Sequence, residues 1–340
     1  MSETIVYSAK KIITMNPSRP EATHVAVRDG RILGAGSLSE LQTWGDVRLD
    51  ERFKDKVLMP GFVEGHAHVM EGSLWSKVYC GWFDRADPGG KIWSGVKSVD
   101  AVVERLRAAE AALEDPAAAV SGWQLDPIYM DNITVTRADL DRVSTTRPVG
   151  VLHASGHIMN VNTKALELAG MMKTGHNHPG IPLGADGLPT GELKGPEVMT
   201  PVGPFVGFER NLLDADEAGL RNFAKLCVRT GTTTITDLAS RMDEDTVDMM
   251  LRVTSEPHYP IRLMPFRFFL GLSAPELVET VLAMKKRATD RLRLGQIKIV
   301  VDGSIQGFSA RLRWPGYHNG APNGLWYIAP EHLSELLHLA

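Results

Sequence analysis

The sequence predicts an α/β protein in which strands alternate with helices, and three observations support this fold class. After about residue 214, β-rich runs alternate with amphipathic helical runs, the pattern of strands joined by crossover helices. Before residue 58, short apolar runs and the Asp29-Gly30 turn predict a small antiparallel sheet. Between these regions, one apolar run ends in His66 and His68, which share a face of an extended strand.

Composition places the chain among soluble globular proteins. Its 340 residues are 43% hydrophobic and 23% charged, enough for one large domain or two ordinary ones. A net charge of −4 argues against a nucleic-acid partner. Two cysteines, Cys80 and Cys227, cannot form a disulfide framework, so a cytoplasmic location is expected. We see no apolar signal sequence and no run of about 18 apolar residues, so no membrane span is expected.

The N-terminal region is expected to pack as a sheet without a catalytic role. The predicted strands cover residues 4–7, 11–15, 22–27 and 31–35. Asp29-Gly30 lies between the last two of these runs and is a strong hairpin signal.

The central stretch runs from Val57 to Met70. A short strand at residues 57–59 precedes the Pro60-Gly61 break, and a second apolar run then carries His66 and His68. Two imidazoles on one strand end can hold one divalent cation. A His-x-His pair alone is a weak signal, because such residues are also common as polar residues at a strand edge.

The surrounding residues carry a family resemblance. The run Met-Pro-Gly-Phe-Val-Glu-Gly-His-Ala-His at 59–68 resembles the first-strand signature of the amidohydrolase superfamily, with Glu64 where that family commonly has Asp. Residues 148–170 and the run Thr-Gly-Glu-Leu at 190–193 resemble its YtcJ-like branch, also called amidohydrolase family 3, which includes N-substituted formamide deformylase.

This resemblance implies a (β/α)8 TIM-like barrel with a flanking N-terminal β-sandwich. Residues 1–58 would form part of the sandwich, and residues 59–340 about the first half of the barrel. An insertion of about residues 75–214 would follow the first barrel strand, where active-site loops of such barrels grow.

The remaining elements follow from periodicity, caps and breakers. Helices are predicted at residues 98–113, 162–169, 215–230, 244–254, 274–288 and 330–340. Strands are predicted at residues 149–153, 231–237, 261–269 and 296–304, the last with a loop at its C-terminal end. Gly122-Trp123 and Asp126-Pro127 are assigned to a loop, and residues 175–195 are expected to be mostly loop.

Lys298 lies in an otherwise apolar strand, where a charged amine is costly unless it is paired or neutralised. The resemblance implies carbamylation by CO2, which converts the amine into an anion that bridges two metals. The alternative is a lysine that extends to solvent at a strand edge.

Other polar residues are weighed against simpler roles. Asp302 lies on the face of Lys298 and either contacts substrate, orients a ligand or caps the following turn. His157 is expected to contact substrate or a metal ligand, and Glu192 is a candidate pocket residue. His153 is expected to be a core histidine. The pair His176 and His178 is expected in a solvated loop, and Trp75, Trp82, Trp93 and Trp123 are expected to pack.

The sequence thus predicts a metal-dependent hydrolase for a non-peptide C–N bond in a small amide, formamide or cyclic amide. Its metal would be one or two divalent ions, with zinc expected, held by His66, His68 and Lys298. The resemblance places two further histidine ligands and the general-base aspartate on later strands, beyond Ala340.

Two other interpretations stay open. The chain could be an incomplete unit whose unpaired sheet edges lead to a homodimer or require a complementary chain. It could also be a barrel enzyme that uses no metal.

Overall fold

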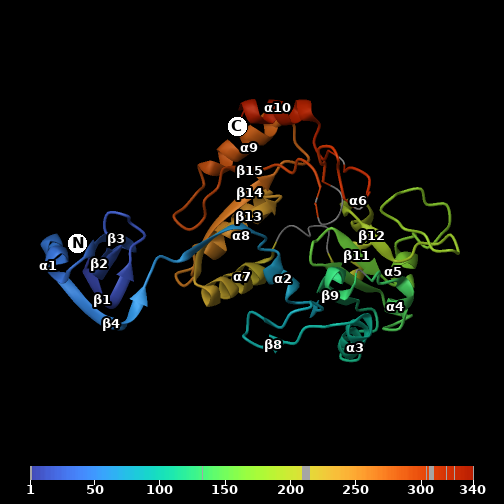
Figure 1. Ribbon diagram of the computed structural model, residues 1–340, viewed down its shortest axis with the longest axis horizontal. Coiled ribbons are helices and arrows are strands. Elements are labelled where there is room, and N and C mark those ends of the chain that lie inside the picture. Colours follow the sequence, from blue (N-terminus) through green and yellow to red (C-terminus); the bar gives the residue numbers. More distant parts are fainter. Residues whose placement is uncertain are drawn as a thin grey trace. The chain divides into compact units, whose positions relative to one another are not determined.

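The computed structural model describes residues 2–131, 133–208, 215–303, 305, 310–318, 320–324 and 326–339. The chain divides into two compact units, Met1–Val63 and Glu64–Ala340. The ribbon in Figure 1 follows the chain from blue at the N-terminus to red at the C-terminus.

The first unit is a four-stranded sheet in the order β3-β2-β1-β4. Its elements are β1 Thr4–Ile13, β2 Glu21–Arg28, β3 Arg31–Gly36, α1 Leu38–Leu41, the 3-10 helix Gln42–Trp44 and β4 Val47–Leu58. Its small core contains Val6, Ala26 and Leu41. The helical connection between β3 and β4 allows β4 to run parallel to β1, while β2 pairs antiparallel with both β1 and β3.

The second unit contains a five-stranded sheet built from the predicted insertion, in the order β12-β11-β10-β9-β6. Its strands are β6 Val78–Tyr79, β9 Val120–Leu125, β10 Val149–His153, β11 Ile158–Val161 and β12 Glu192–Lys194. The flanking elements are the hairpin of β7 Arg85–Ala86 and β8 Ile92–Trp93, the helices α3 Val99–Glu110, α4 Arg137–Asp141, α5 Thr163–Leu168 and α6 Pro196–Met199, and the 3-10 helices Pro127–Met130 and Gly203–Val206.

Both faces of this five-stranded sheet are covered. Along β10, Val149 and Val151 enter one core cluster, whereas Leu152 enters another with Trp123. Ser98 caps α3 by accepting a hydrogen bond from the Ala101 N–H, and the buried side chains of this helix pack on the first of these clusters. The sheet therefore has its own core on either side.

A second large sheet has the strand order β15-β14-β13-β5. The elements are β5 Phe62–Ala67, α2 Glu71–Leu74, α7 Glu217–Thr230, β13 Thr232–Ser240, α8 Glu244–Thr254, β14 Arg262–Phe268, α9 Ala274–Lys285 and β15 Gln296–Lys298. β14 is parallel to both β13 and β15, so the strands and helices after residue 215 alternate as the sequence predicts.

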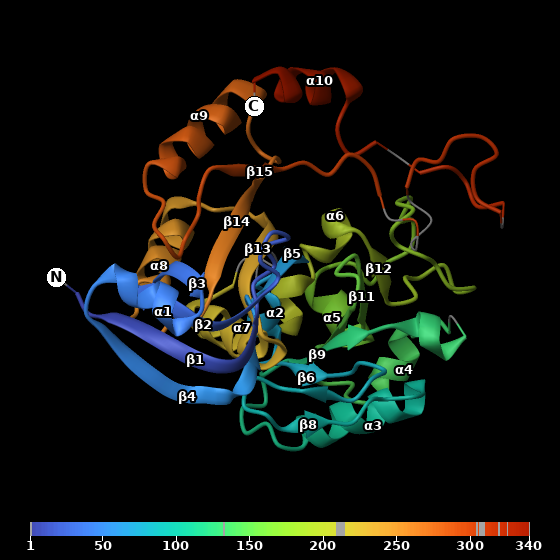
Figure 2. The ribbon, with the colours of Figure 1, turned by 60° about the vertical axis from the view of Figure 1, so that its left-hand side comes forward.

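Helices cover this second sheet. Buried side chains of α7 and α8 share one core cluster with Ile235 of β13 and Leu263 of β14. A separate cluster joins α9, the end of β14 and α10 Pro330–Leu339, and α9 and α10 lie side by side in Figures 1 and 2. Among the helices of the described residues, none has both the length and the apolar character that crossing a membrane requires.

Several predictions about local structure are wrong. The predicted strands at residues 4–7 and 11–15 form one strand, β1, whose register shifts between Ser8 and Ile12. The first sheet is mixed rather than antiparallel, because β1 and β4 are parallel. Gly122 and Trp123 lie in the buried strand β9 rather than in a loop. Residues 175–195 are mostly loop, as predicted, and contain only the short strand β12 among named elements of the described residues.

The segment 296–304 begins with a short strand and continues without regular structure, in line with the predicted strand and C-terminal loop. β15 ends at Lys298, and Asp302 forms an isolated antiparallel bridge with Trp326. Ser304, the insertion boundary at residues 209–214 and Ala340 lie outside the described residues.

Candidate metal-binding site

His66 and His68 lie where β5 ends. His66 is exposed and His68 is half-buried, and their ring centroids are 5.4 Å apart in an edge-to-face arrangement. The Glu64 carboxylate accepts a hydrogen bond from the His66 N–H at 2.9 Å, which holds the local backbone. The two imidazoles therefore lie together at one strand end, as the i, i+2 spacing predicts.

Asp237 lies beside this pair and was not singled out by the sequence. It is 1% exposed on β13, and its Oδ1 lies 3.9 Å from His68 Nδ1. The same oxygen accepts a hydrogen bond from the Val69 N–H at 3.4 Å. Asp237 thus fixes the backbone directly after His68. One sequence signal could have identified Asp237: it lies near the carboxyl end of a predicted parallel strand, and functional polar residues gather at the carboxyl ends of such strands.

The electrostatic environment shows which groups approach His68. Burial, with a smaller contribution from the charges of His66, Lys298 and His157, lowers the pKa of His68 to about 4. Burial also lowers the pKa of His157. His68 is therefore neutral at neutral pH, the state in which imidazole binds a metal. The structure brings four of the six predicted site residues into one electrostatic neighbourhood.

Lys298 reaches this neighbourhood from the last strand of the sheet. It is half-buried rather than fully enclosed, and it is aligned with Phe268 of β14. Its position at the end of β15 corresponds to that of His66 and His68 at the end of β5.

His66 and His68 are arranged so that they could supply two ligands to one divalent metal ion. Two rings that share one ion, with metal–nitrogen distances of about 2.0–2.1 Å, must lie about as close as these two rings do. Among the residues that the structure describes, no group of three or more His, Cys, Asp or Glu side chains is arranged to hold a metal ion. His66 and His68 are thus a ligand pair that needs further donors.

The other two predicted residues have partners of their own. Glu192 is buried in β12, forms an ion pair with Lys194 at 2.7 Å, and adds its charge to the surroundings of His153. Asp302 Oδ2 accepts a hydrogen bond from the Arg311 N–H at 2.8 Å, which ties it to a residue nine positions later rather than to the turn that directly follows it. No contact between either carboxylate and the histidine pair is seen in the described residues.

Residues assigned to simpler roles have them. His153 is half-buried and its Nε2 contacts the amide oxygen of Asn160. His176 and His178 lie in a loop, where His176 contacts the Met171 carbonyl and His178 contacts Glu197. Trp75, Trp93 and Trp123 pack around one core cluster and Trp82 against another.

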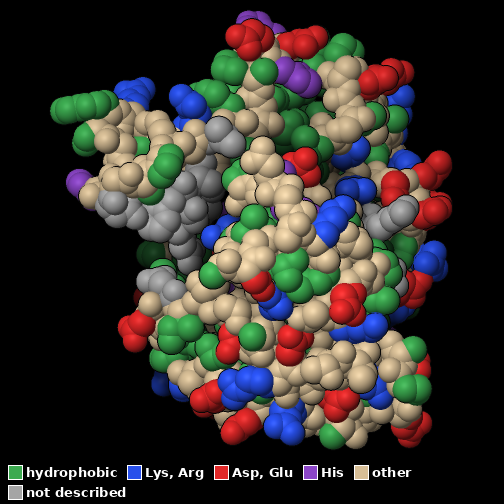
Figure 3. All heavy atoms as spheres, turned by 90° about the vertical axis from the view of Figure 1, so that its right-hand side faces the viewer, with side chains coloured by type: hydrophobic (Ala, Val, Ile, Leu, Met, Phe, Trp, Pro, Cys, Tyr) green, Lys and Arg blue, Asp and Glu red, His purple; other side chains and the backbone are tan. Residues whose placement is uncertain are grey.

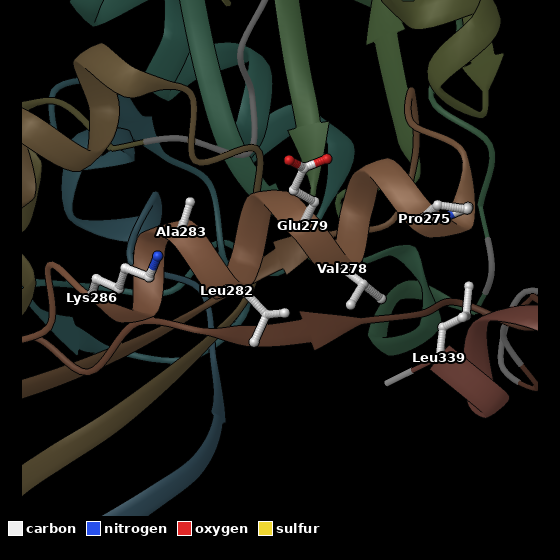
Figure 4. Close-up of a pocket in the computed structure, with 7 residues that line it drawn as sticks. All are labelled: Pro275, Val278, Glu279, Leu282, Ala283, Lys286 and Leu339. Atoms are coloured by element: carbon white, nitrogen blue, oxygen red, sulfur yellow. The ribbon is translucent and has the colours of Figure 1, made fainter.

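A groove of about 430 Å³ lies elsewhere in the second unit. It is lined by Pro275, Val278, Glu279, Leu282 and Ala283 of α9, by Lys286 directly after that helix, and by Leu339 of α10 (Figure 4). None of these residues belongs to the predicted site. On the face shown in Figure 3, basic and acidic side chains are interspersed.

Comparisons with known proteins point to one family. The model of a family described as the amidohydrolase family matches residues 54–325. The protein LONG AFTER FAR-RED 3 of Arabidopsis thaliana is 28% identical over 336 residues, which cover 95% of this chain and 54% of that protein. The putative amidohydrolase YtcJ of Bacillus subtilis (strain 168) is 27% identical over 348 residues, covering 97% of this chain and 60% of that protein.

Two solved structures share the fold. An uncharacterized metal-dependent hydrolase from Pyrococcus horikoshii OT3 superposes with a TM-score of 0.68 at 16% identity, covering 99% of this chain and 63% of that one. A second, from Pyrococcus furiosus, gives a TM-score of 0.62 at 17% identity, with coverage of 99% and 65%. The chain thus spans between about half and two-thirds of the length of these proteins.

Proposed function

Because this chain belongs to the amidohydrolase family, we propose that it carries the first metal ligands of a metal-dependent hydrolase. The proposed reaction is hydrolysis of a non-peptide C–N bond in a small amide, formamide or cyclic amide. The observation that carries the proposal is the convergence of His66, His68 and the buried Asp237 at the ends of β5 and β13. Because the chain spans little more than half of its curated relatives, this activity is proposed for the whole protein.

The proposed metal would supply Lewis acidity, which activates water and polarises a carbonyl oxygen. His66 and His68 would hold it through neutral imidazoles. Asp237 would restrain the His68 backbone through the Val69 N–H, and its carboxylate is near enough to His68 Nδ1 to favour one ring orientation. His157 would face the substrate, since it is exposed and lies near enough for its charge to act on His68.

Lys298 is proposed as a further donor. Carbamylation would convert its amine into an anion and remove the cost of a cation beside two imidazoles. Support comes from its place at the end of β15 and from the effect of its charge on His68. Zinc is the proposed ion, since imidazole and carboxylate-like oxygens suit it.

The sheet β5-β13-β14-β15 is proposed to supply the first four strands of a (β/α)8 barrel. Its support is the run of strands and helices from residue 215 and the parallel pairing of β13, β14 and β15. Residues 1–58 are proposed to be part of a flanking β-sandwich, of which the structure describes one sheet.

The test is metal binding by the chain and hydrolysis by the whole protein. We expect the purified chain to bind Zn²⁺, and His66→Ala together with His68→Ala to abolish that binding. His176→Ala is the matched control, since it removes a half-buried histidine from a loop. Metal binding is measured by competition with a chromophoric chelator, and hydrolysis with N-substituted formamides. Full hydrolysis by the double variant of the whole protein would refute a metal role for the pair.

A further inference from the structure

The backbone that follows His68 turns directly into a very short helix. The Glu71 N–H donates to the His68 carbonyl oxygen at 3.1 Å, and the Gly72 N–H donates to the Val69 carbonyl oxygen at 3.0 Å. The helix α2 has four residues, too few to be stable alone. The orientation of His68 therefore depends on what holds α2 in place.

One side of α2 is held by α7. A Cβ atom on Gly72 would lie 1.9 Å from the Gly219 carbonyl oxygen, so the two backbones are in direct contact. The Ser73 hydroxyl also donates to the Asp216 carboxylate at 2.9 Å. These contacts fix α2 to the helix that precedes β13.

The other attachment comes from the inserted segment. Arg85 Nη2 lies 2.6 Å from the Glu71 carboxylate. Its guanidinium stacks 5.7 Å from the Trp75 ring centroid and 5.9 Å from that of Trp123. The two indoles contact each other edge to face at 5.1 Å, and Trp123 is 1% exposed in β9. A guanidinium that lies against a packed pair of indoles and is also bonded to a carboxylate has fewer orientations open to it.

We propose that the Glu71–Arg85 ion pair is a positioning device that transmits the rigidity of the inserted sheet to His68 and so sets the metal affinity of the His66–His68 pair. The chain of contacts runs from Trp123 through Arg85 and Glu71 to the His68 carbonyl. This inference rests on the proposed function. Both side chains of the pair are partly exposed, at 35% and 26%, so it adds little to overall stability. Its effect should therefore appear in the metal site rather than in unfolding.

The experiment compares Zn²⁺ affinity in Arg85→Met, Glu71→Gln and the double variant of the full chain. Each single variant should weaken binding about 10-fold, the usual cost of losing a group that orients a ligand. The double variant should lose no more than either single one, because the pair acts as a unit. Arg85→Lys should recover only part of the affinity, because an ammonium lacks the planar fork.

Arg147→Met is the matched control, since Arg147 pairs with Glu110 at 3.1 Å within the same inserted segment. It should lower the melting temperature and leave the affinity unchanged. The absorption spectrum of bound Co²⁺ gives a second readout that a purely structural role would not move.

If Arg85→Met does not fold, Glu71→Gln and Arg85→Lys carry the test. Wild-type affinity in the Glu71 and Arg85 variants would overturn the inference and leave the proposed function standing. Absence of His66- and His68-dependent binding in the wild type would overturn both.

Discussion

The two large sheets of the second unit differ in how completely they are covered. In the inserted sheet, four of the five residues of β10 are buried, and alternate residues enter different cores. In the other sheet, only two of the seven residues of the interior strand β14 are buried, and all three residues of β15 are half-buried. The segment that looks like an insertion thus has the more complete core. The candidate chemistry lies on the more open sheet, where side chains remain free to bind.

The largest expected effect compares the same truncation in the two regions. Leu152→Ala should lower the free energy of unfolding by about 3 kcal/mol, because Leu152 is 2% exposed between packed strands. Leu282→Ala on α9, where the side chain is 54% exposed, should cost less than about 1 kcal/mol. Urea unfolding followed by circular dichroism measures both. An equal loss of unfolding free energy in the two variants would mean that the groove on α9 is covered in solution. The proposed difference in coverage between the two sheets would then be wrong.

A smaller effect tests how the open sheet is joined to its helices. Gly72→Ala should cost about 2 kcal/mol, because the new methyl group would overlap the Gly219 carbonyl oxygen and force α2 away from α7. Gly30→Ala, at a position with open space around it, controls for the loss of a glycine in the unfolded chain, although its φ of +72° adds strain of its own. Unchanged stability in Gly72→Ala would show that α2 can move without cost.

The smallest effect compares one thiol from each region. Burial raises the pKa of Cys80 to about 12 and that of Cys227 to about 11. Because both values lie well above 8, both thiols are protonated at pH 8 and should react slowly with an aromatic disulfide reagent. Cys80 should be the slower, since it lies in the core of the inserted sheet at 0% exposure. Mass spectrometry identifies which thiol is labelled first. Faster labelling of Cys80 than of Cys227 would mean that the core of the inserted sheet is the more accessible of the two.

Local signals were sufficient for most helices. α8 begins and ends at the predicted residues, because Asp243 supplies an N-cap and the apolar residues that follow have helical spacing. Ser98 caps α3 as predicted. Such signals lie within a few residues of each other, so they can be read without knowing the tertiary partners.

Features that depend on distant partners were missed. Gly122 looks like a loop residue, but it lies in a closely packed strand, where a Cβ would lie 3.1 Å from Cys80 Sγ. Asp237 and Arg85 acquire their roles only when β13 and the inserted segment approach His68 and Glu71. The His-x-His pair was found because its geometry is local to one strand.

The parallel pairing of β1 with β4 has a consequence for synthesis of the chain. Strands β1 to β3 can pair as they leave the ribosome, but Thr4 aligns with Val47 and Ile12 with Leu58. The first sheet is therefore completed only after residue 58 has emerged, which makes this pairing a slow, non-local step. β5 begins at Phe62, only a few residues later. The strand that bears the histidine pair thus emerges as the first unit closes, and it must wait for β13, more than 150 residues downstream, before it has a neighbour.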